Sequence, residues 1–195
     1  MPKVLVVNNY PARDRAGKLE SCIEGNGGAV TAVEWGDASA SLFDSFDGVV
    51  LSGSPDMMTE RRTEAKFLKE RDAILESNAP ILGICFGHQL VARAFEAEVV
   101  KDRKPVQEMI RTTVITEDQL FAGLPKSLML LESRHEVVKS LPAGFTLLAK
   151  SATSAIAAMK SRSRPIYGVQ FHPERYSVDH PEGKAVLGNF VGMLK

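Results

Sequence analysis

The sequence has little cysteine, no net charge and no long apolar run. Two cysteines in 195 residues are too few for a secreted disulfide framework. Equal numbers of basic and acidic residues, 24 of each, argue against nucleic acid or a membrane as partner, because both favour a basic surface. The apolar run within MPKVLVVNN is too short for a signal sequence or a membrane span. We therefore expect a cytoplasmic protein with reduced thiols.

The composition that is present is that of an ordinary globular domain. Hydrophobic residues make up 44% and charged residues 25% of the chain, and this length suffices to bury a core without a disulfide or a metal ion. Glycine, proline and charge are spread evenly, with no repeat and no linker. We expect one domain over residues 1–195, and we assign no residue to a metal.

Strand and helix patterns alternate in the first half of the chain. Short apolar runs predict strands, and apolar residues at helical spacing predict the helices between them. The expected strands are Lys3 to Asn8, Ala29 to Trp35, Phe46 to Ser52 and Pro80 to Cys85; the expected helices are Ala16 to Gly25, Thr63 to Ser77 and Gly87 to Phe95. This rhythm predicts an α/β fold, a flavodoxin-like open parallel sheet with helices on both faces.

The second half is richer in strands. Short strand-like runs follow one another with little helix between them, and a last helix is expected at about Glu182 to Leu194. The runs are Thr112 to Thr116, Leu128 to Glu132, Thr146 to Ala149, Ala155 to Met159 and Ile166 to Phe171. They predict a smaller, β-rich antiparallel extension of the parallel sheet.

Cys85 lies in a pattern typical of a catalytic nucleophile. The segment from Gly83 to Gly87 reads G-I-C-F-G, between an expected strand and an expected helix, as in a nucleophile elbow. Small residues two positions either side let a strained turn close, and the helix N-terminus favours a thiolate. The alternative is a buried core cysteine, which is how we interpret Cys22, on an apolar helix face.

A thiol nucleophile needs a base, and His172 is the candidate. It follows the expected strand Ile166 to Phe171 and precedes Pro173, which favours an extended backbone at the histidine. Glu174, two residues on, is placed to reach back and orient the imidazole. Of the other histidines, His88 falls in the helix after the elbow and His180 in a polar loop.

Three segments together resemble the class I, or triad, glutamine amidotransferases. They read LSGSP, PILGICFGHQ and GVQFHPE, beginning at Leu51, Pro80 and Gly168. The resemblance implies that Cys85 attacks the glutamine side-chain amide, that His172 is general base and acid, and that Glu174 orients it. It also implies an oxyanion hole from the backbone of Ser54 and Phe86, although the family has glycine where this chain has Ser54.

The same resemblance implies a glutamine site and a partner. Gly53, Gln89, Arg134 and His135 would contact the glutamine. Within the family the likeness is to the stand-alone amidotransferase subunit of GMP synthetase, through Ser133 to Phe145 and Ile166 to Phe171. This implies that the partner is an ATP-pyrophosphatase (synthetase) subunit, which receives ammonia for the conversion of XMP to GMP, with ATP and Mg bound there and no cofactor in this chain. Two segments are candidates for docking, although a solvated loop is the preferred interpretation of each: Asp56 to Arg62 and Lys160 to Arg164.

Three alternatives remain open at this point. The start Asn8-Asn9-Tyr10 resembles the glutamine subunits of anthranilate and aminobenzoate synthases, and an unassigned amidotransferase is equally compatible with the triad. A stand-alone γ-glutamyl thiol hydrolase would use the same three residues without a partner. A regulatory module with a relic elbow is disfavoured because Cys85, His172 and Glu174 are all present.

Overall fold

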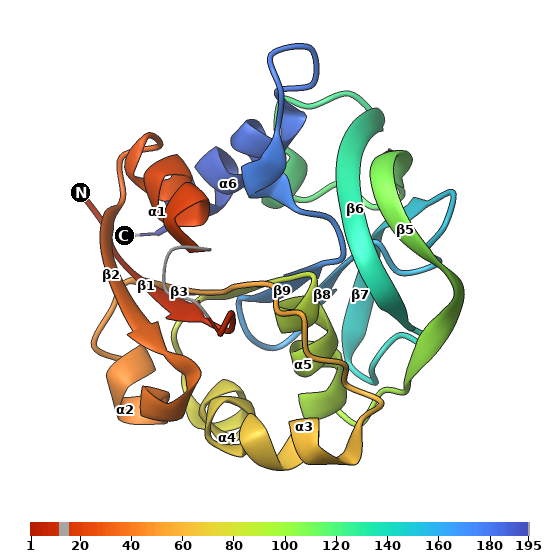
Figure 1. The fold of residues 1–195 in the computed structure, drawn as a ribbon. Coiled ribbons are helices and arrows are strands. Elements are labelled where there is room, and N and C mark those ends of the chain that lie inside the picture. The colour runs from red at the N-terminus through yellow and green to blue at the C-terminus, as the bar shows by residue number, and fades with distance from the viewer. Residues whose placement is uncertain (12–15, 195) are drawn as a thin grey trace.

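The computed structural model describes residues 1–11 and 16–194, which form one nine-stranded mixed sheet with helices on both faces (Figure 1). The strand order is β2-β1-β3-β4-β9-β8-β7-β5-β6. The first five strands in this order are parallel to one another, and the remaining pairs are antiparallel. The predicted fold, a parallel sheet with an antiparallel extension, is confirmed, and the extension continues the same sheet.

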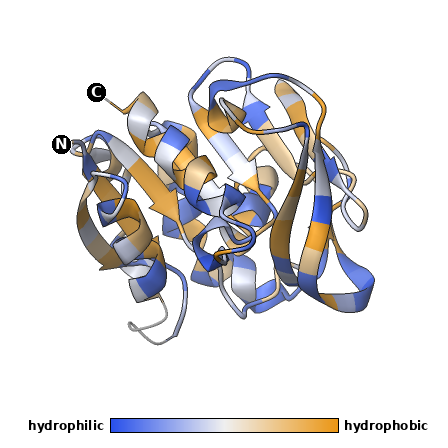
Figure 2. Cartoon of the chain, turned by 90° about the horizontal axis from the view of Figure 1, so that it is seen from above, coloured by the Kyte–Doolittle hydropathy of each residue, from blue (hydrophilic) through white to orange (hydrophobic). Residues whose placement is uncertain are grey.

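The parallel strands have the order of a flavodoxin-like sheet. They are β2 (Ala29–Glu34), β1 (Lys3–Asn8), β3 (Gly48–Leu51), β4 (Ile81–Ile84) and β9 (Ile166–Val169). Because side chains alternate between the faces of a strand, β1 sends Val4 and Val6 into one core and Leu5 and Val7 into the other. Figure 2 shows these strands as a largely hydrophobic layer inside the fold.

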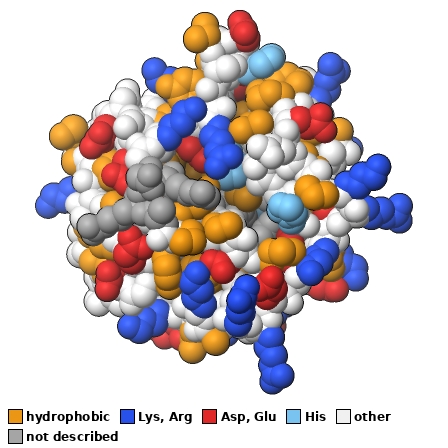
Figure 3. Space-filling model, in the orientation of Figure 1, with side chains coloured by type: hydrophobic (Ala, Val, Ile, Leu, Met, Phe, Trp, Pro, Cys, Tyr) orange, Lys and Arg blue, Asp and Glu red, His pale blue; other side chains and the backbone are white. Residues whose placement is uncertain are grey.

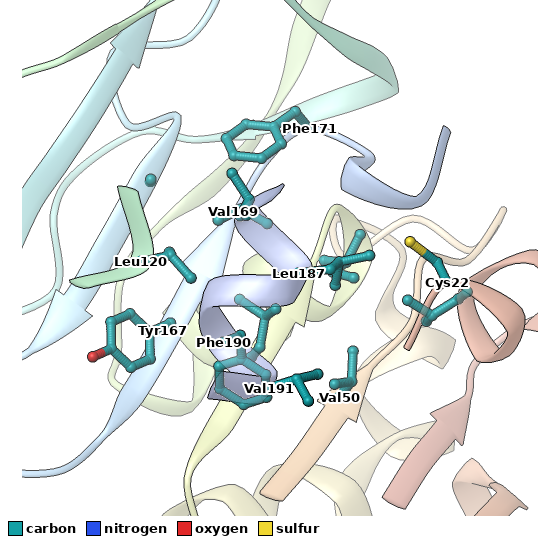
Figure 4. Packing of buried hydrophobic residues seen from close by; sticks show 14 of the residues in the cluster. Cys22, Val50, Leu120, Tyr167, Val169, Phe171, Leu187, Phe190 and Val191 are labelled. Carbon is teal, nitrogen blue, oxygen red and sulfur yellow. The ribbon is translucent and has the colours of Figure 1, made fainter. Parts of the chain in front are cut away.

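Helices cover the two faces separately. One face carries α1 (Gly17–Glu24) and α6 (Glu182–Met193), and the other carries α2 (Ala40–Phe43), α3 (Arg61–Lys66), α4 (Leu68–Glu76) and α5 (Phe86–Ala94). Figure 4 shows how α6 packs: Leu187, Phe190 and Val191 lie among core side chains of β9 and β3. Cys22 of α1 is buried in the same core.

The antiparallel part differs most from its prediction. Its strands are β5 (Val99–Val114), β6 (Ser127–Val138), β7 (Phe145–Ser151) and β8 (Ala158–Ser161). The first two are a long hairpin of which only the ends at Thr112 and Leu128 were predicted. The start of β5 is charged and mostly exposed, and its register shifts between Lys101 and Val106. A two-residue apolar period is therefore absent there.

The expected helix from Thr63 to Ser77 is interrupted. The structure divides it into α3 and α4 at Phe67, whose φ of −102° and ψ of 19° leave the helical region. Phe67 and Ile74 are buried as expected, but Leu68 and Leu75 are 43% and 39% exposed. Polar side chains, Glu70 among them, take their place on the buried face.

Short 3-10 turns complete the fold, at η2 (Trp35–Asp37), η3 (Gln119–Phe121) and η4 (Pro173–Arg175). The last of these follows β9. The segments after β1, β3, β4 and β9 all leave the same edge of the sheet, because parallel strands end on one side. Open α/β sheets bind their ligands at this carboxyl edge, and it is here that the candidate catalytic residues meet.

Candidate active site

Cys85 occupies a strained turn between β4 and α5. Its φ is 51° and its ψ is −100°, and among the described residues only Glu96 is another non-glycine residue with positive φ. A hydrogen bond to the end of β9 fixes the turn, because the Cys85 N–H donates to Val169 O at 2.8 Å. Backbone strain of this kind is concentrated at functional sites. The strained conformation predicted for a nucleophile elbow is therefore present at Cys85.

The two glycines of the elbow are required by close backbone approach. A Cβ at Gly83 would stand 2.4 Å from Gly87 O, and a Cβ at Gly87 would stand 2.5 Å from Leu51 O. Neither obstacle is a flexible side chain, so any larger residue would force the strand and helix apart. The G-x-C-x-G spacing thus reflects the packing of α5 against β4 and β3.

The strain at Cys85 predicts an unusual order of stabilities. We expect Cys85→Gly to be more stable than Cys85→Ala by about 1 kcal/mol, because glycine relieves about 1–3 kcal/mol of strain at positive φ but costs about 0.4–1 kcal/mol in unfolded-state entropy. Urea denaturation of the two variants measures the difference.

The matched control for this stability comparison is Cys22, in the regular helix α1. There the order should reverse, with Cys22→Gly about 1 kcal/mol less stable than Cys22→Ala. If Cys85→Gly proved the less stable of its pair as well, the elbow would hold no strain.

His172 lies against both Cys85 and Glu174. Its Nδ1 is 2.7 Å from Glu174 Oε1, and its backbone N–H donates to Leu131 O at 2.7 Å. Cys85 lines the same cavity as His172, and its thiol lies 3.5 Å from Ser133 O. Burial lowers the pKa of His172, but the charges of Glu174 and Cys85 outweigh this and raise the pKa to about 10. The arrangement therefore favours an imidazolium beside the Glu174 carboxylate and near the Cys85 sulfur.

Glu174 is the buried orienting group of this set. Its side chain is 8% exposed and belongs to η4. Burial raises the pKa of Glu174, but the neighbouring His172 charge and hydrogen bond hold the pKa below its ordinary value. The carboxylate thereby stays ionised and fixes the imidazole with Nδ1 towards itself, which leaves Nε2 for the sulfur.

The two backbone groups expected to form an oxyanion hole both border the site. Phe86 is the first residue of α5, so its N–H has no acceptor within the helix. Ser54 follows β3, and its φ is not positive, so serine is accommodated where the family has glycine. Its hydroxyl lies 3.1 Å from Asp56 Oδ2 and accepts from the Asp56 N–H. Ser54 therefore does not need a backbone conformation reserved for glycine, and the departure is compatible with an oxyanion role for its N–H.

A cavity of about 280 Å³ opens beside the sulfur of Cys85. Predicted residues Ser54, Phe86, Gln89, Arg134 and His135 line it together with Cys85 and His172. Gly53 lies just behind it, where a Cβ would stand 2.6 Å from Tyr10 Oη and 3.0 Å from His172 Cε1. The structure thus brings the predicted site residues together at one small polar cavity, which most of them line; Gly53 lies behind it and Glu174 contacts His172.

The expected glutamine-contacting side chains differ in how free they are. Gln89 donates through Nε2 to Glu136 O at 2.9 Å. The Arg134 guanidinium is buried and pairs with Glu132 at 2.8 Å and Asp102 at 2.5 Å, so only its backbone remains for a ligand. His135 is exposed at the cavity. Of the predicted set, the Arg134 side chain is the one held away from the cavity.

The lining residues that were not predicted as site residues include Tyr10, Glu136 and Arg175. Tyr10 follows β1; burial and the Glu174 charge raise the pKa of its hydroxyl to about 12, which keeps it neutral. Arg175, beside the cavity, donates weakly to Tyr10 Oη at 3.5 Å. Glu136 accepts from the backbone of Met58 at 2.6 Å and of Thr59 at 3.1 Å. From the sequence, Tyr10 was considered only as part of Asn8-Asn9-Tyr10, and nothing in the sequence signals the Glu136 contact.

The two proposed docking segments are partly engaged within the chain. In the first, Met58 is buried and Lys66 pairs with Asp56 at 2.6 Å. In the second, Lys160 pairs with Asp118 at 2.6 Å and Arg164 donates to Leu75 O and Ser77 O. Figure 3 shows basic and acidic side chains interspersed over the face in view. Within the described residues no helix is both long enough and apolar enough to cross a bilayer.

Comparisons with known proteins agree with this geometry. Residues 17–193 match the family model described as glutamine amidotransferase class-I. The chain is 43% identical over 143 residues, 73% of each sequence, to a subunit of the glutamine-hydrolyzing GMP synthase of Pyrococcus abyssi. It is 34% identical over 190 residues to the equivalent GMP synthase subunit of Thermoplasma acidophilum, covering 90% of this chain and 92% of that one.

Solved structures give the same fold. A Thermoplasma acidophilum protein described as a GMP synthase subunit superimposes with a TM-score of 0.85 and 32% identity, covering 98% of this chain and 93% of that one. A glutamine amidotransferase from Thermotoga maritima gives a TM-score of 0.74 at 20% identity, over 89% and 76% of the two chains, and supports the fold alone.

Proposed function

The chain belongs to the class I glutamine amidotransferase family, and from this premise we propose that it is the glutamine-hydrolysing subunit of a two-subunit GMP synthase. The observation that carries the proposal is the arrangement of Cys85, His172 and Glu174 at a cavity in a chain similar over most of its length to GMP synthase subunits. We further propose that residues 1–195 act as one amidotransferase domain, since a single sheet joins both halves.

The reaction follows from the positions of the three side chains. The Cys85 thiolate attacks the side-chain amide carbon of glutamine, and the carbonyl oxygen becomes an oxyanion that the Ser54 and Phe86 N–H groups stabilise. The His172 imidazolium gives its proton to the departing nitrogen, so the carbon–nitrogen bond breaks and ammonia leaves a glutamyl thioester on Cys85.

Water completes the cycle. His172, now neutral, takes a proton from water as the oxygen attacks the thioester carbon, and the carbon–sulfur bond breaks to give glutamate and the Cys85 thiolate. Glu174 keeps Nδ1 of the imidazole occupied throughout, so that the same Nε2 serves both half-reactions. Gly53, Gln89, His135 and the backbone of Arg134 hold the glutamine in the cavity.

Ammonia then passes to the second subunit of the complex. That partner is the synthetase subunit, an ATP-pyrophosphatase that binds ATP and Mg and aminates XMP to GMP. This chain itself uses no cofactor, and the complex acts in the cytoplasm. The support for this pathway is the similarity to GMP synthase subunits from several organisms.

The deciding experiment measures ammonia release from glutamine by the purified chain, with and without a synthetase subunit, ATP and XMP. We expect the rate of glutamine hydrolysis to rise at least about tenfold when all three are present. A tenfold change corresponds to about 1.4 kcal/mol, which lies within the usual range of coupling free energies between two sites, about 1–3 kcal/mol. Formation of GMP from glutamine by the pair should accompany the rise.

Two other results would replace this assignment. Stimulation by a chorismate-using subunit in place of the GMP synthase partner would favour anthranilate or aminobenzoate synthesis. Rapid turnover of γ-glutamyl peptides by the chain alone would favour a stand-alone thiol hydrolase.

A further inference from the structure

Glu70 is a buried carboxyl group outside the catalytic set. It lies on α4 with 0% of its surface exposed. Its Oε1 accepts a hydrogen bond from Asn9 Nδ2 at 3.1 Å. Asn9 is equally buried and follows β1 at the carboxyl edge of the sheet, near the site. A buried carboxyl group here requires an explanation, because an ionised one without a cation is costly.

Asn9 connects this carboxyl group to the loop after β3. Its backbone N–H donates to Ser52 Oγ at 2.8 Å, and its Nδ2 donates to Ser52 O at 3.2 Å. The Ser52 hydroxyl in turn donates to Gly53 O at 2.9 Å. The direction of each bond is fixed, since a backbone N–H can only donate and a carbonyl oxygen can only accept.

The bond to Gly53 O sets the orientation of the next peptide N–H. Gly53 O and the Ser54 N–H belong to one planar peptide unit and point in opposite directions. A hydroxyl that holds the Gly53 carbonyl therefore also holds the Ser54 N–H. This is the donor assigned to the oxyanion, so the chain from Glu70 ends at a group that touches the reaction.

Two buried atoms in this series of hydrogen bonds from Glu70 to Gly53 lack a partner as long as Glu70 is ionised. They are Asn9 Oδ1 and Glu70 Oε2. Both hydrogens of Asn9 Nδ2 are already used, one by Ser52 O and one by Glu70 Oε1. A proton on Oε2 would make this atom a donor, and Asn9 Oδ1 is an unpartnered acceptor on the residue that Oε1 already contacts. A bond between these two atoms would close a two-bond ring between acid and amide. Burial, only partly offset by the Asn9 hydrogen bond, raises the pKa of Glu70 to about 8.

We propose that Glu70 is a positioning residue which, as a neutral carboxylic acid paired with the Asn9 amide, acts through Ser52 to hold the Ser54 N–H in place for the oxyanion. The inference rests on the proposed function of Ser54. A glutamine at position 70 can form the same ring as a protonated Glu70, because its NH₂ replaces the acid O–H and its carbonyl replaces Oε1. Glutamine therefore distinguishes a neutral Glu70 from an ionised one, whose charge it cannot supply.

The test compares Glu70→Gln with Glu70→Met in the glutaminase assay with the synthetase subunit, ATP and XMP. Glu70→Gln should keep kcat within about twofold of the unaltered chain. Glu70→Met should lower kcat at least about tenfold with KM changed less than about twofold, because the lost interaction acts on the transition state. Glu76→Met, an exposed change on the same helix, is the control and should change neither.

Infrared spectroscopy reads the proton directly. At pH 7 the unaltered chain should show a protonated carboxylic acid C=O band that is absent in Glu70→Gln and in Glu70→Met and present in Glu76→Met. Ser52→Ala, which removes only the connecting hydroxyl, should lower kcat at least about tenfold while keeping the band. It also provides the kinetic test if Glu70→Met fails to fold.

Several outcomes would overturn the proposal. They are a missing acid band, a large loss of kcat in Glu70→Gln, or normal kcat in Ser52→Ala or folded Glu70→Met. Failure of the proposed function looks different: the unaltered chain would hydrolyse no glutamine in the complex, while the infrared band would still report the state of Glu70.

Discussion

Replacement of Cys85 by alanine is expected to abolish GMP formation from glutamine and to leave GMP formation from added ammonia unchanged. In the proposed reaction the sulfur is the atom that forms the thioester, and no other side chain of the site is assigned that role. Loss of a nucleophile from such a set lowers kcat by at least about 10⁴-fold. Ammonia enters after this step, so the synthetase reaction does not need the sulfur.

The assay follows GMP formed by the paired subunits with glutamine or with an ammonium salt as nitrogen donor. Cys22→Ala is the matched control, because Cys22 is a buried core residue of α1, and both activities should persist in it. Loss of ammonia-dependent synthesis together with glutamine-dependent synthesis in Cys85→Ala would contradict a division of labour between two active sites.

Glu174→Gln is expected to produce the second large loss, lowering kcat for glutamine hydrolysis by about 10²–10⁴-fold. Glutamine has nearly the same shape but no charge. The amide therefore neither stabilises the imidazolium nor enforces the tautomer with its hydrogen on Nδ1. The 2.7 Å contact between His172 and Glu174 is the geometry on which this expectation depends.

The residual activity should also lose tolerance to alkali. The pKa of His172 is raised to about 10 because the Glu174 and Cys85 charges outweigh burial. Removing the Glu174 charge leaves burial less opposed, so the pKa must fall. Since the imidazolium must protonate the departing ammonia, activity disappears as pH rises through this pKa, and the alkaline limb of the kcat profile should move to lower pH.

An exposed acidic residue supplies the control for the pH profile. Asp179 lies in the exposed segment after η4, and Asp179→Asn should leave both kcat and the alkaline limb unchanged. An alkaline limb that stayed in place in Glu174→Gln would show that His172 does not titrate in that limb. Full activity in Glu174→Gln would remove Glu174 from the catalytic set.

The catalytic elbow and the parallel sheet were predictable because their signals are local. Val4, Leu5, Val6 and Val7 make a continuous apolar run that only a strand buried on both faces explains. The glycines around Cys85 mark a turn in which no Cβ fits. The glycine pattern reflects contacts between residues that are near in sequence. The apolar run reflects the burial of a whole strand on both faces.

The hairpin of β5 and β6 and the division between α3 and α4 were not predictable in the same way. The charged start of β5 is held by its pairing with β6 across the register shift between Lys101 and Val106, which leaves no period in the sequence. On α4, Glu70 is buried and bonded to Asn9 from another element, whereas Leu68 and Leu75, which were expected to be buried, are exposed. Tertiary contact overrode local pattern in each case.

By itself the sequence determined the fold class, the family and the proposal that Cys85, His172 and Glu174 come together, because short motifs carry the turn and the chemistry together. Only the tertiary structure decided which neighbours complete the site: that the Arg134 guanidinium is taken up by Glu132 and Asp102, and that Tyr10 borders the cavity. The physical reason is that burial and charge pairing depend on residues brought together from separate strands, and chain order does not record those distances.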